Sequence, residues 1–358
     1  MQQQNSLMKS TLVYCILFVA AAMSVMLYYA ATKPVGVADL AQDEVVHSEK
    51  PEEPVVVAPA LGDAVNINID RTSQNSNYFC IPMPEIVKAE DVILENHYMN
   101  KELWVSIQSA KTQECEEFYK LNSVYGNCQS VVEGHFEASE NRSCLQFALT
   151  GVYEYRSIFE DHTLYVEFVP PKEVYERVIV VDPAYGGAET GVAVDGILSK
   201  DITLNIAQAV KELFDESDVK VYYTRMDDSN PAAADRVELA AAAKADMLIR
   251  IEVSGDENSK LYGTVAVYNS KFFIPGFGNV ELADLLEREV VTAISGKAGG
   301  LIEAGPTDEV ISGATVPAAA IRVGYLTNSQ EAILLQREDY IKRIAEGIYN
   351  AVEKAYEQ

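Results

Sequence analysis

The stretch Val178–Gly187, with the sequence V-I-V-V-D-P-A-Y-G-G, constrains the fold of this chain more than any other. Four consecutive β-branched residues are typical of a buried strand in a parallel sheet. Asp182 and Pro183 end the strand, and the two glycines that follow allow a tight turn. In open α/β sheets, functional groups lie just beyond the carboxyl ends of such strands. We therefore expect Tyr185 to lie at a functional edge of the sheet.

Strand-like and helical patterns alternate from residue 171 to residue 358. The predicted strands cover residues 178–181, 219–223, 247–251, 264–268 and 320–323. Amphipathic helical patterns cover residues 201–214, 231–244, 281–294 and 338–356. Such alternation predicts an α/β domain with a mostly parallel sheet that is covered by helices on both faces.

Residues 64–170 show a different pattern, without helical periodicity. Apolar and polar residues alternate at 65–69, 103–107 and 164–168, and two further strands are predicted at 131–138 and 145–155. Asn100 lies between two strand-like runs and indicates a hairpin turn. Short strands with polar turns predict a small all-β sandwich domain.

Four of the five cysteines lie in the predicted β-sandwich: Cys80, Cys115, Cys128 and Cys144. In an exported domain, this even number permits two disulfides. The alternative is a set of free, partly buried thiols. All four histidines also precede residue 170, and none is spaced from another as metal ligands are.

The N-terminal part of the chain predicts a membrane anchor. Leu12–Ala31 is a run of twenty uncharged residues, which is long enough to span a bilayer as a helix. A cleaved signal peptide is the alternative, although its apolar core is usually only about 7–15 residues. We expect residues 1–11 to form a cytoplasmic tail, residues 12–31 a transmembrane signal-anchor, and residues 32–63 an extended, acidic, proline-rich linker.

The charge of the chain excludes one class of partner. Its 28 Lys and Arg against 54 Asp and Glu give a formal net charge of −26, which would repel a phosphate backbone. We therefore expect no nucleic-acid binding. Because the acidic residues follow the predicted anchor, we expect a single-pass protein of the cell membrane with both folded domains outside the cytoplasm.

Seven collinear motifs span most of residues 176–357. They are V-D-P-x-x-G-G at 181–187, K-D-I-T-L-N-I-A at 200–207, V-Y-Y-T-R at 221–225, R-V-E-L-A-A at 236–241, K-A-D-M-L-I at 244–249, G-T-V-A-V-Y at 263–268 and P-A-A-A-I-R-V-G-Y-L-T-N at 317–328. Together they resemble the catalytic domain of zinc-dependent N-acetylmuramoyl-L-alanine amidases, which cut the bond between the peptidoglycan glycan and its stem peptide. The preceding β-sandwich resembles, by its position, the targeting domain of some cell-wall amidases.

The resemblance also implies which residues should bind zinc, and this chain departs at each of them. The three family ligand positions are occupied by Tyr185, Ser199 and Glu252, and the catalytic glutamate position is occupied by Arg322. A catalytic zinc needs three protein ligands and an open position for water. Phenol and hydroxyl groups are poor ligands at neutral pH, and arginine cannot act as a general base.

We therefore expect no zinc cofactor and expect Arg322 to form an ion pair with Glu252 where the family has its metal. The resulting hypothesis is a pseudoenzyme that binds peptidoglycan or a cell-wall or divisome protein, and that regulates cell-wall hydrolysis. The residues predicted to line its groove are Asp182, Tyr185, Glu252, Arg322 and Asn328.

Two alternatives remain open at the level of sequence. One is an active amidase with unusual ligands, for which the nearby carboxylates are Asp182, Glu189, Asp195, Asp201 and Glu252. Carboxylates alone would favour Mg²⁺, Ca²⁺ or Mn²⁺ over Zn²⁺. The other is a structural envelope protein that acts through its β-sandwich.

Overall fold

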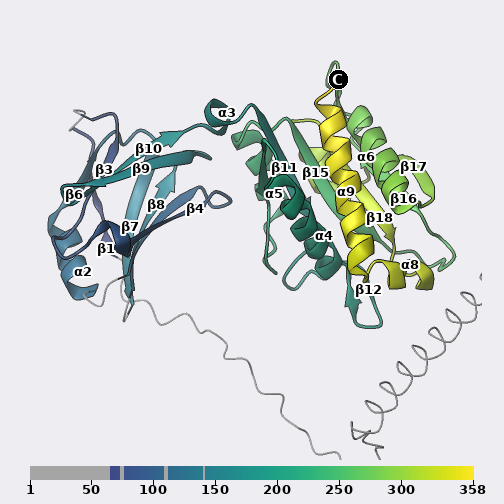
Figure 1. Cartoon of the computed structure of the whole chain (residues 1–358), viewed down its shortest axis with the longest axis horizontal. Helices are drawn as coiled ribbons and strands as arrows, with labels where there is room; N and C mark the ends of the chain where they lie inside the picture. Colours follow the sequence, from purple (N-terminus) through teal and green to yellow (C-terminus); the bar gives the residue numbers. More distant parts are fainter. Residues whose placement is uncertain (1–64, 73–75, 109–111, 140–141) are drawn as a thin grey trace, which may run out of the picture. The chain divides into compact units, whose positions relative to one another are not determined.

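The computed structural model describes residues 65–72, 76–108, 112–139 and 142–358 (Figure 1). The predicted cytoplasmic tail, transmembrane anchor and acidic linker at residues 1–63 lie outside the described residues. Within the described ranges, every helix is too short or too polar to cross a bilayer.

Two five-stranded sheets form the β-sandwich, as the strand pattern predicts. The first has the order β1 (Val65–Asn66), β7 (Val131–Ser139), β8 (Arg142–Leu149), β5 (Glu102–Gln108) and β4 (Val92–His97). The second has the order β2 (Asn68–Asp70), β6 (Ser123–Gly126), β3 (Phe79–Pro82), β10 (Thr163–Val169) and β9 (Glu154–Glu160). Inward-facing residues of both sheets share one hydrophobic core, in which the ring of Phe79 meets that of Phe147 edge-on at 5.0 Å.

The structure corrects two details of the predicted sandwich. The single strand predicted at 145–155 is two strands, because the chain turns between Leu149 and Glu154. The helix α2 (Thr112–Leu121) was not predicted, since it buries only Cys115 and Tyr119 and so carries a single apolar i, i+4 pair. The hairpin at Asn100 is confirmed: the Asn100 amide donates to the carbonyl of His97, and β4 pairs with β5.

The four cysteines of the sandwich are buried free thiols, which is the second of the two alternatives. Short helical segments complete this part of the chain: η1 (Ala89–Asp91) precedes β4, and α3 (Pro171–Val174) leads into the next domain.

A six-stranded sheet forms the centre of the α/β domain. Its order is β14 (Val219–Tyr223), β11 (Arg177–Pro183), β15 (Met247–Ser254), β18 (Ala318–Tyr325), β16 (Thr264–Tyr268) and β17 (Ala298–Glu303). The first four strands are parallel, whereas β16 runs antiparallel to β18 and parallel to β17. The five predicted strands are confirmed; β17 was missed because its sequence, A-G-G-L-I-E, contains two glycines and no β pattern. A small hairpin, β12 (Ala193–Val194) and β13 (Ile197–Leu198), precedes the first long helix.

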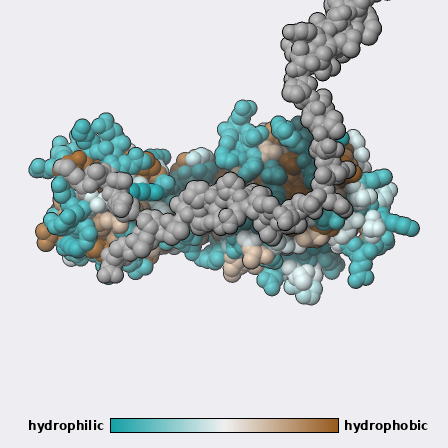
Figure 2. All heavy atoms as spheres, turned by 90° about the horizontal axis from the view of Figure 1, so that it is seen from below, coloured by the Kyte–Doolittle hydropathy of each residue, from teal (hydrophilic) through white to brown (hydrophobic). Residues whose placement is uncertain are grey.

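Helices cover both faces of this sheet, as predicted. On one face lie α4 (Ser199–Phe214), α6 (Asn279–Ile294) and α9 (Glu338–Ala355), which run side by side in Figure 1. On the other face lie α5 (Ala233–Ala242) and α7 (Glu309–Gly313), while α8 (Ser329–Leu334) follows β18. On the side seen in Figure 2, hydrophilic residues cover most of the described surface, with smaller hydrophobic patches between them.

Candidate functional site

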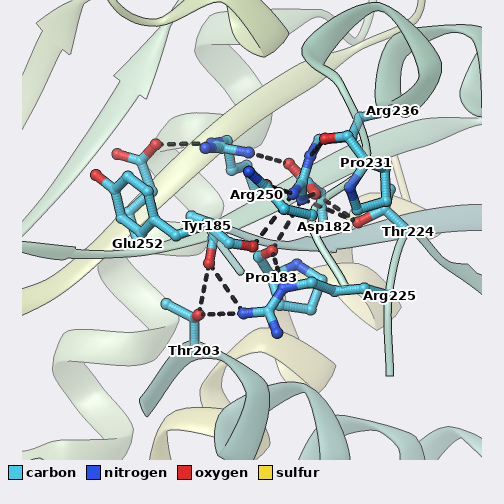
Figure 3. Close-up of polar contacts among 12 residues, drawn as sticks. Asp182, Pro183, Tyr185, Thr203, Thr224, Arg225, Pro231, Arg236, Arg250 and Glu252 are labelled. Atoms are coloured by element: carbon cyan, nitrogen blue, oxygen red, sulfur yellow. Dashed lines mark hydrogen bonds and ion pairs between the residues drawn. The ribbon is translucent and has the colours of Figure 1, made fainter. Parts of the chain in front are cut away.

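Four charged side chains form a row across three parallel strands of the α/β sheet. Asp182 of β11 lies beside Arg250 of β15, and Glu252 of β15 lies beside Arg322 of β18. All four occupy the face that α5 and α7 cover, because the alternating positions before them, such as Val180 on β11, pack on that side. We call these four residues the charged row; it lies towards the carboxyl ends of the strands. Figure 3 shows three of its members, Asp182, Arg250 and Glu252.

Asp182, at one end of the charged row, is fully buried and bonded on both oxygens. Its Oδ1 accepts from the Thr224 hydroxyl at 2.5 Å and pairs with Arg236, and its Oδ2 pairs with Arg250. Burial alone would raise the pKa of Asp182, but the two guanidinium groups hold this pKa below its ordinary value. Asp182 is therefore a structural anion that fixes the end of β11.

Glu252, in the middle of the charged row, is held by two arginines. Its Oε1 accepts from Nε of Arg250 at 2.7 Å, and its Oε2 accepts from Nε of Arg322 at 2.9 Å. The predicted ion pair between Arg322 and Glu252 is thus present. Arg322 also pairs with Asp308 at 2.6 Å, so it bridges two carboxylates. Burial would lower the pKa of Arg322, but Glu252 and Asp308 raise it above its ordinary value.

Tyr185 lies next to the charged row, just after β11, as the sequence predicts. It has a φ of 66°, which is uncommon for an aromatic residue. A Cβ atom added at Gly191 would lie 2.5 Å from the Tyr185 ring and 3.0 Å from Cβ of Ser199. Gly191 therefore leaves the space in which Tyr185 and Ser199 come together. Burial, with a further contribution from Glu252, raises the pKa of the Tyr185 phenol, so this group is neutral at physiological pH.

Ser199 and Asn328 have local structural contacts. Ser199 is fully buried at the start of α4, and its hydroxyl donates to the carbonyl of Val192 at 3.0 Å. Asn328 caps α8, where its Oδ1 accepts from the amides of Gln330 and Glu331 at 3.1 and 3.3 Å. The structure thus brings Tyr185, Ser199, Glu252 and Arg322 together with Asp182, whereas Asn328 serves as a helix cap.

A cavity of about 350 Å³ opens beside Tyr185, lined also by Glu189, Asn230, Arg236, Arg250 and Glu309. Of the five residues predicted to line a groove, Tyr185 is the one on this cavity. Among the alternative carboxylates, Glu189 accepts from the Asn230 amide at 3.1 Å, and Asp195 lies in the turn between β12 and β13. Within the part of the chain that the structure describes, there is no group of three or more His, Cys, Asp or Glu side chains placed to hold a metal ion.

The donor set at the family ligand positions does not fit zinc. Both oxygens of Glu252 are engaged by guanidinium groups, and the Ser199 hydroxyl is committed to a backbone carbonyl. The phenol of Tyr185 is neutral, and the positive charges of Arg250 and Arg322 would repel a cation at this point. The site is a closed set of ion pairs.

Sequence reasoning missed three partners of the charged row: Arg236, Arg250 and Asp308. For two of them, Arg236 and Arg250, the sequence contains a pattern that could have indicated their role. Arg236 lies inside one of the seven motifs, and Arg250 alternates with Glu252 in an otherwise apolar strand, which indicates a charged stripe on one face. Asp308 lies in an irregular segment before α7, where the sequence has no period that could place it.

Comparison with known proteins agrees with this fold. A model of the N-acetylmuramoyl-L-alanine amidase family matches residues 179–354, so the α/β domain of this chain belongs to that family. The chain is 26% identical over 182 residues to the uncharacterised protein YqiI of Bacillus subtilis, a match that covers 51% of this chain and 86% of YqiI.

A further relative and a solved structure are each similar over about half of this chain. The chain is 23% identical over 183 residues to the N-acetylmuramoyl-L-alanine amidase LytC of Bacillus subtilis, which covers 51% of this chain and 36% of LytC, about a third of its length. The crystal structure of an N-acetylmuramoyl-L-alanine amidase from Clostridium difficile 630 is 27% identical, with a TM-score of 0.48, and covers 51% of this chain and 97% of that one.

Proposed function

We propose that this protein is a catalytically inactive member of the amidase family that is anchored in the cell membrane, binds the peptidoglycan cell wall outside the cytoplasm and regulates its hydrolysis. The observation that carries the proposal is the engagement of both Glu252 oxygens by Arg250 and Arg322. Each oxygen of this carboxylate thus pairs with a guanidinium group, which would compete with a metal ion for it.

The charge balance around the charged row supports loss of catalysis. Together with their partners Asp308 and Arg236, the residues of the row form a set of six. In this set, three carboxylates (Asp182, Glu252 and Asp308) pair with three guanidinium groups (Arg236, Arg250 and Arg322). The ionic set is neutral as it stands, so a divalent cation would add two uncompensated charges to a largely buried site. Hydrolysis by metal-activated water therefore has no basis among these residues.

Binding to the wall is supported by family membership and by the cavity beside Tyr185. That cavity lies at the carboxyl edge of the sheet, where open α/β sheets bind ligands, and its lining includes Arg250, whose side chain is 13% exposed. Stem peptides of peptidoglycan end in carboxylates, which guanidinium groups bind well. A cell-wall or divisome protein is the second class of partner that this surface would serve.

The proposed location rests on the sequence of residues 1–63. An uncharged run at 12–31 would anchor the chain, and the acidic linker at 32–63 would hold the folded domains away from the membrane. A flexible linker of that length spans roughly 30 Å on average, and its prolines and like charges would extend it further.

The test is a pair of measurements on the full-length protein with purified sacculi. We expect it to sediment with sacculi and to release no soluble muropeptide, with or without chelator. A matched variant that restores the family residues, Tyr185→His, Ser199→Glu, Glu252→His and Arg322→Glu, should gain zinc binding. Chelator-sensitive release by the unmodified protein would support the active-enzyme alternative and contradict the proposal.

A further inference from the structure

The strand β14 lies at one edge of the six-stranded sheet and, among the described strands, pairs only with β11. The amide of Thr224 donates to the carbonyl of Val181, which turns the backbone groups of Thr224 toward β11. Because successive residues of a strand point their backbone groups to opposite sides, those of Val219, Val221 and Tyr223 point away from β11. These groups form the outer edge of β14.

Both ends of this outer edge are bonded, whereas its middle is free. At the start, the Ser217 hydroxyl accepts from the amide of Val219 at 3.2 Å. At the end, the Tyr98 hydroxyl donates to the carbonyl of Tyr223 at 3.0 Å and accepts from its amide at 3.2 Å. Within the described ranges, the amide and carbonyl of Val221 have no hydrogen-bond partner. Such unpaired backbone groups are a template for pairing with a further strand.

A groove of about 740 Å³ lies along the outer edge of β14. Its apolar lining includes Phe214, Val221 and Tyr223 from α4 and β14, and Val174 and Tyr175 from the segment before β11. Val174 is 39% exposed, so the groove presents apolar surface to solvent. Its volume is in the range of ligand sites, about 300–1,000 Å³.

Tyr223 adds a polar group without a partner to this groove. The residue is 6% exposed, and its hydroxyl is buried with no hydrogen-bond partner in the described part of the chain. Buried hydroxyl groups are normally bonded, because an unbonded one loses its contact with water and gains nothing in return. A ligand that brings a polar side chain into the groove would supply the missing bond.

The charges around the groove are mostly acidic. Its lining carboxylates are Glu176, Asp215 and Asp218, against two lysines, Lys211 and Lys220. Both lysines pair with carboxylates, whereas Glu176 is exposed and forms no ion pair with any described residue. The whole chain carries a formal net charge of −26. A positively charged ligand is therefore favoured here.

The surroundings of β14 decide what kind of strand fits. Tyr98, from the turn between β4 and β5, bonds the end of β14, and Tyr175 lines the same groove. A single extended segment needs only about 5 Å in the plane of the sheet. A second copy of this chain would bring a whole sheet and its covering helices to the same edge, against these two side chains. The groove therefore suits one extended segment.

From these contacts we infer that β14 binds an extended, basic segment of a partner protein by strand addition. The main chain of the segment bonds the amide and carbonyl of Val221. Its apolar side chains, which alternate with polar ones, lie in the groove against Phe214, and a polar side chain bonds the Tyr223 hydroxyl. The inference goes beyond the proposed function, because this contact needs neither peptidoglycan nor the charged row.

The test is fluorescence anisotropy of a labelled peptide, K-V-T-V-T-V-K with blocked ends, titrated with the full-length protein in detergent micelles. Two further peptides serve as controls. E-V-T-V-T-V-E reverses the charge, and K-V-T-P-T-V-K keeps the charge but lacks the central amide. We expect the first peptide to bind about tenfold more tightly than either control. Micelles without protein provide the blank.

Variants of the protein test whether the peptide lies on β14. Val221→Pro removes an amide that points away from β11, so the bonds within the sheet are kept and the affinity should fall about tenfold. Val221→Thr keeps the amide and the β-branched shape and should bind like the unmodified protein. Tyr223→Phe should weaken binding by about threefold through loss of the hydroxyl. Thermal unfolding of each variant checks that the sheet is intact.

Equal binding of the three peptides, or unchanged affinity in Val221→Pro or in Tyr223→Phe, would overturn the inference. Dimers that dissociate in Val221→Pro would assign the edge to a second copy and would overturn it as well. A protein that sediments with sacculi but does not bind the peptide keeps the proposed function and loses this inference. Binding of the peptide without binding to sacculi has the reverse meaning.

Discussion

The two faces of the six-stranded sheet differ in the residues that their strands turn toward the helices. Toward α4, α6 and α9, the strands present mainly apolar side chains, such as Ile179, Ile249 and Ile321. Toward α5 and α7, they present apolar residues in their first halves and then the charged row. One face is thus mainly a hydrophobic core, and the other changes from hydrophobic to ionic along β11, β15 and β18.

The two faces therefore contribute differently to the domain. The apolar face stabilises the fold, and the face with the charged row carries the residues that depart from the family pattern. Burial of apolar area on the first face stabilises the fold by itself, at about 25 cal/mol per Å². Buried ion pairs add little net stability, although removing one partner leaves an uncompensated charge and is costly. The charged row is therefore a set of residues that must be kept or lost together.

The largest effect is expected for Asp182→Ala. The substitution leaves the buried guanidinium groups of Arg236 and Arg250 without their shared partner, so the free energy of unfolding should fall by about 3–5 kcal/mol. Urea denaturation followed by circular dichroism measures this change. A loss below about 1 kcal/mol would show that Asp182 is not a necessary buried partner of Arg236 and Arg250.

The same residue predicts a dependence of stability on pH. The pKa of Asp182 is lower in the folded state than in the unfolded chain, so its stabilisation is present above the unfolded pKa of about 3.9 and is lost as pH falls through the folded value. Denaturation midpoints of the unmodified protein should therefore drop as the pH falls below about 4. Asp182→Ala should show a smaller drop over the same range, and an identical drop would remove Asp182 from the explanation.

On the apolar face, Ile249→Ala should lower the free energy of unfolding by about 2–5 kcal/mol through loss of burial and formation of a cavity. Because no charge is involved, this loss should be the same at pH 4 and pH 7. A loss that varies with pH would mean that the two faces are coupled.

A double-mutant cycle at Glu252 and Arg322 tests the ionic pair directly. Glu252→Gln should cost about 1–3 kcal/mol, because both Arg250 and Arg322 lose a charged partner. Arg322→Gln should lower the free energy of unfolding less in the Glu252→Gln variant than in the unmodified protein. The difference, the coupling energy of the pair, should be about 1 kcal/mol. Strict additivity would indicate that the pair contributes nothing.

A smaller effect is expected for Gly191→Ala. Its φ of 65° disfavours a side chain, and the added methyl group would press on the ring of Tyr185, so the free energy of unfolding should fall by about 1–2 kcal/mol. In a Tyr185→Ala background the cost should be smaller, since the ring is gone. An equal cost in both backgrounds would mean that Gly191 serves only the backbone.

The sequence predicted the parts of this molecule that depend on periodicity and missed those that depend on tertiary contacts. The strand at Val178–Val181 and the pairing of Glu252 with Arg322 were foreseeable, because parallel strands bring their carboxyl ends to one edge. The edge strand β17 was missed because its glycines hide the strand pattern, and Asp308 because an irregular segment carries it to Arg322. The helix cap formed by Asn328 was also not predicted, because it depends on where α8 begins.

The most direct test of the account is the metal content of the full-length protein purified without chelator and dialysed against zinc. The account predicts well under one zinc per chain, and no change in thermal stability when chelator is added. It also predicts that the four-residue variant restoring the family residues binds zinc and is destabilised by chelator. One tightly bound zinc per unmodified chain, with chelator-sensitive release of muropeptides, would contradict it.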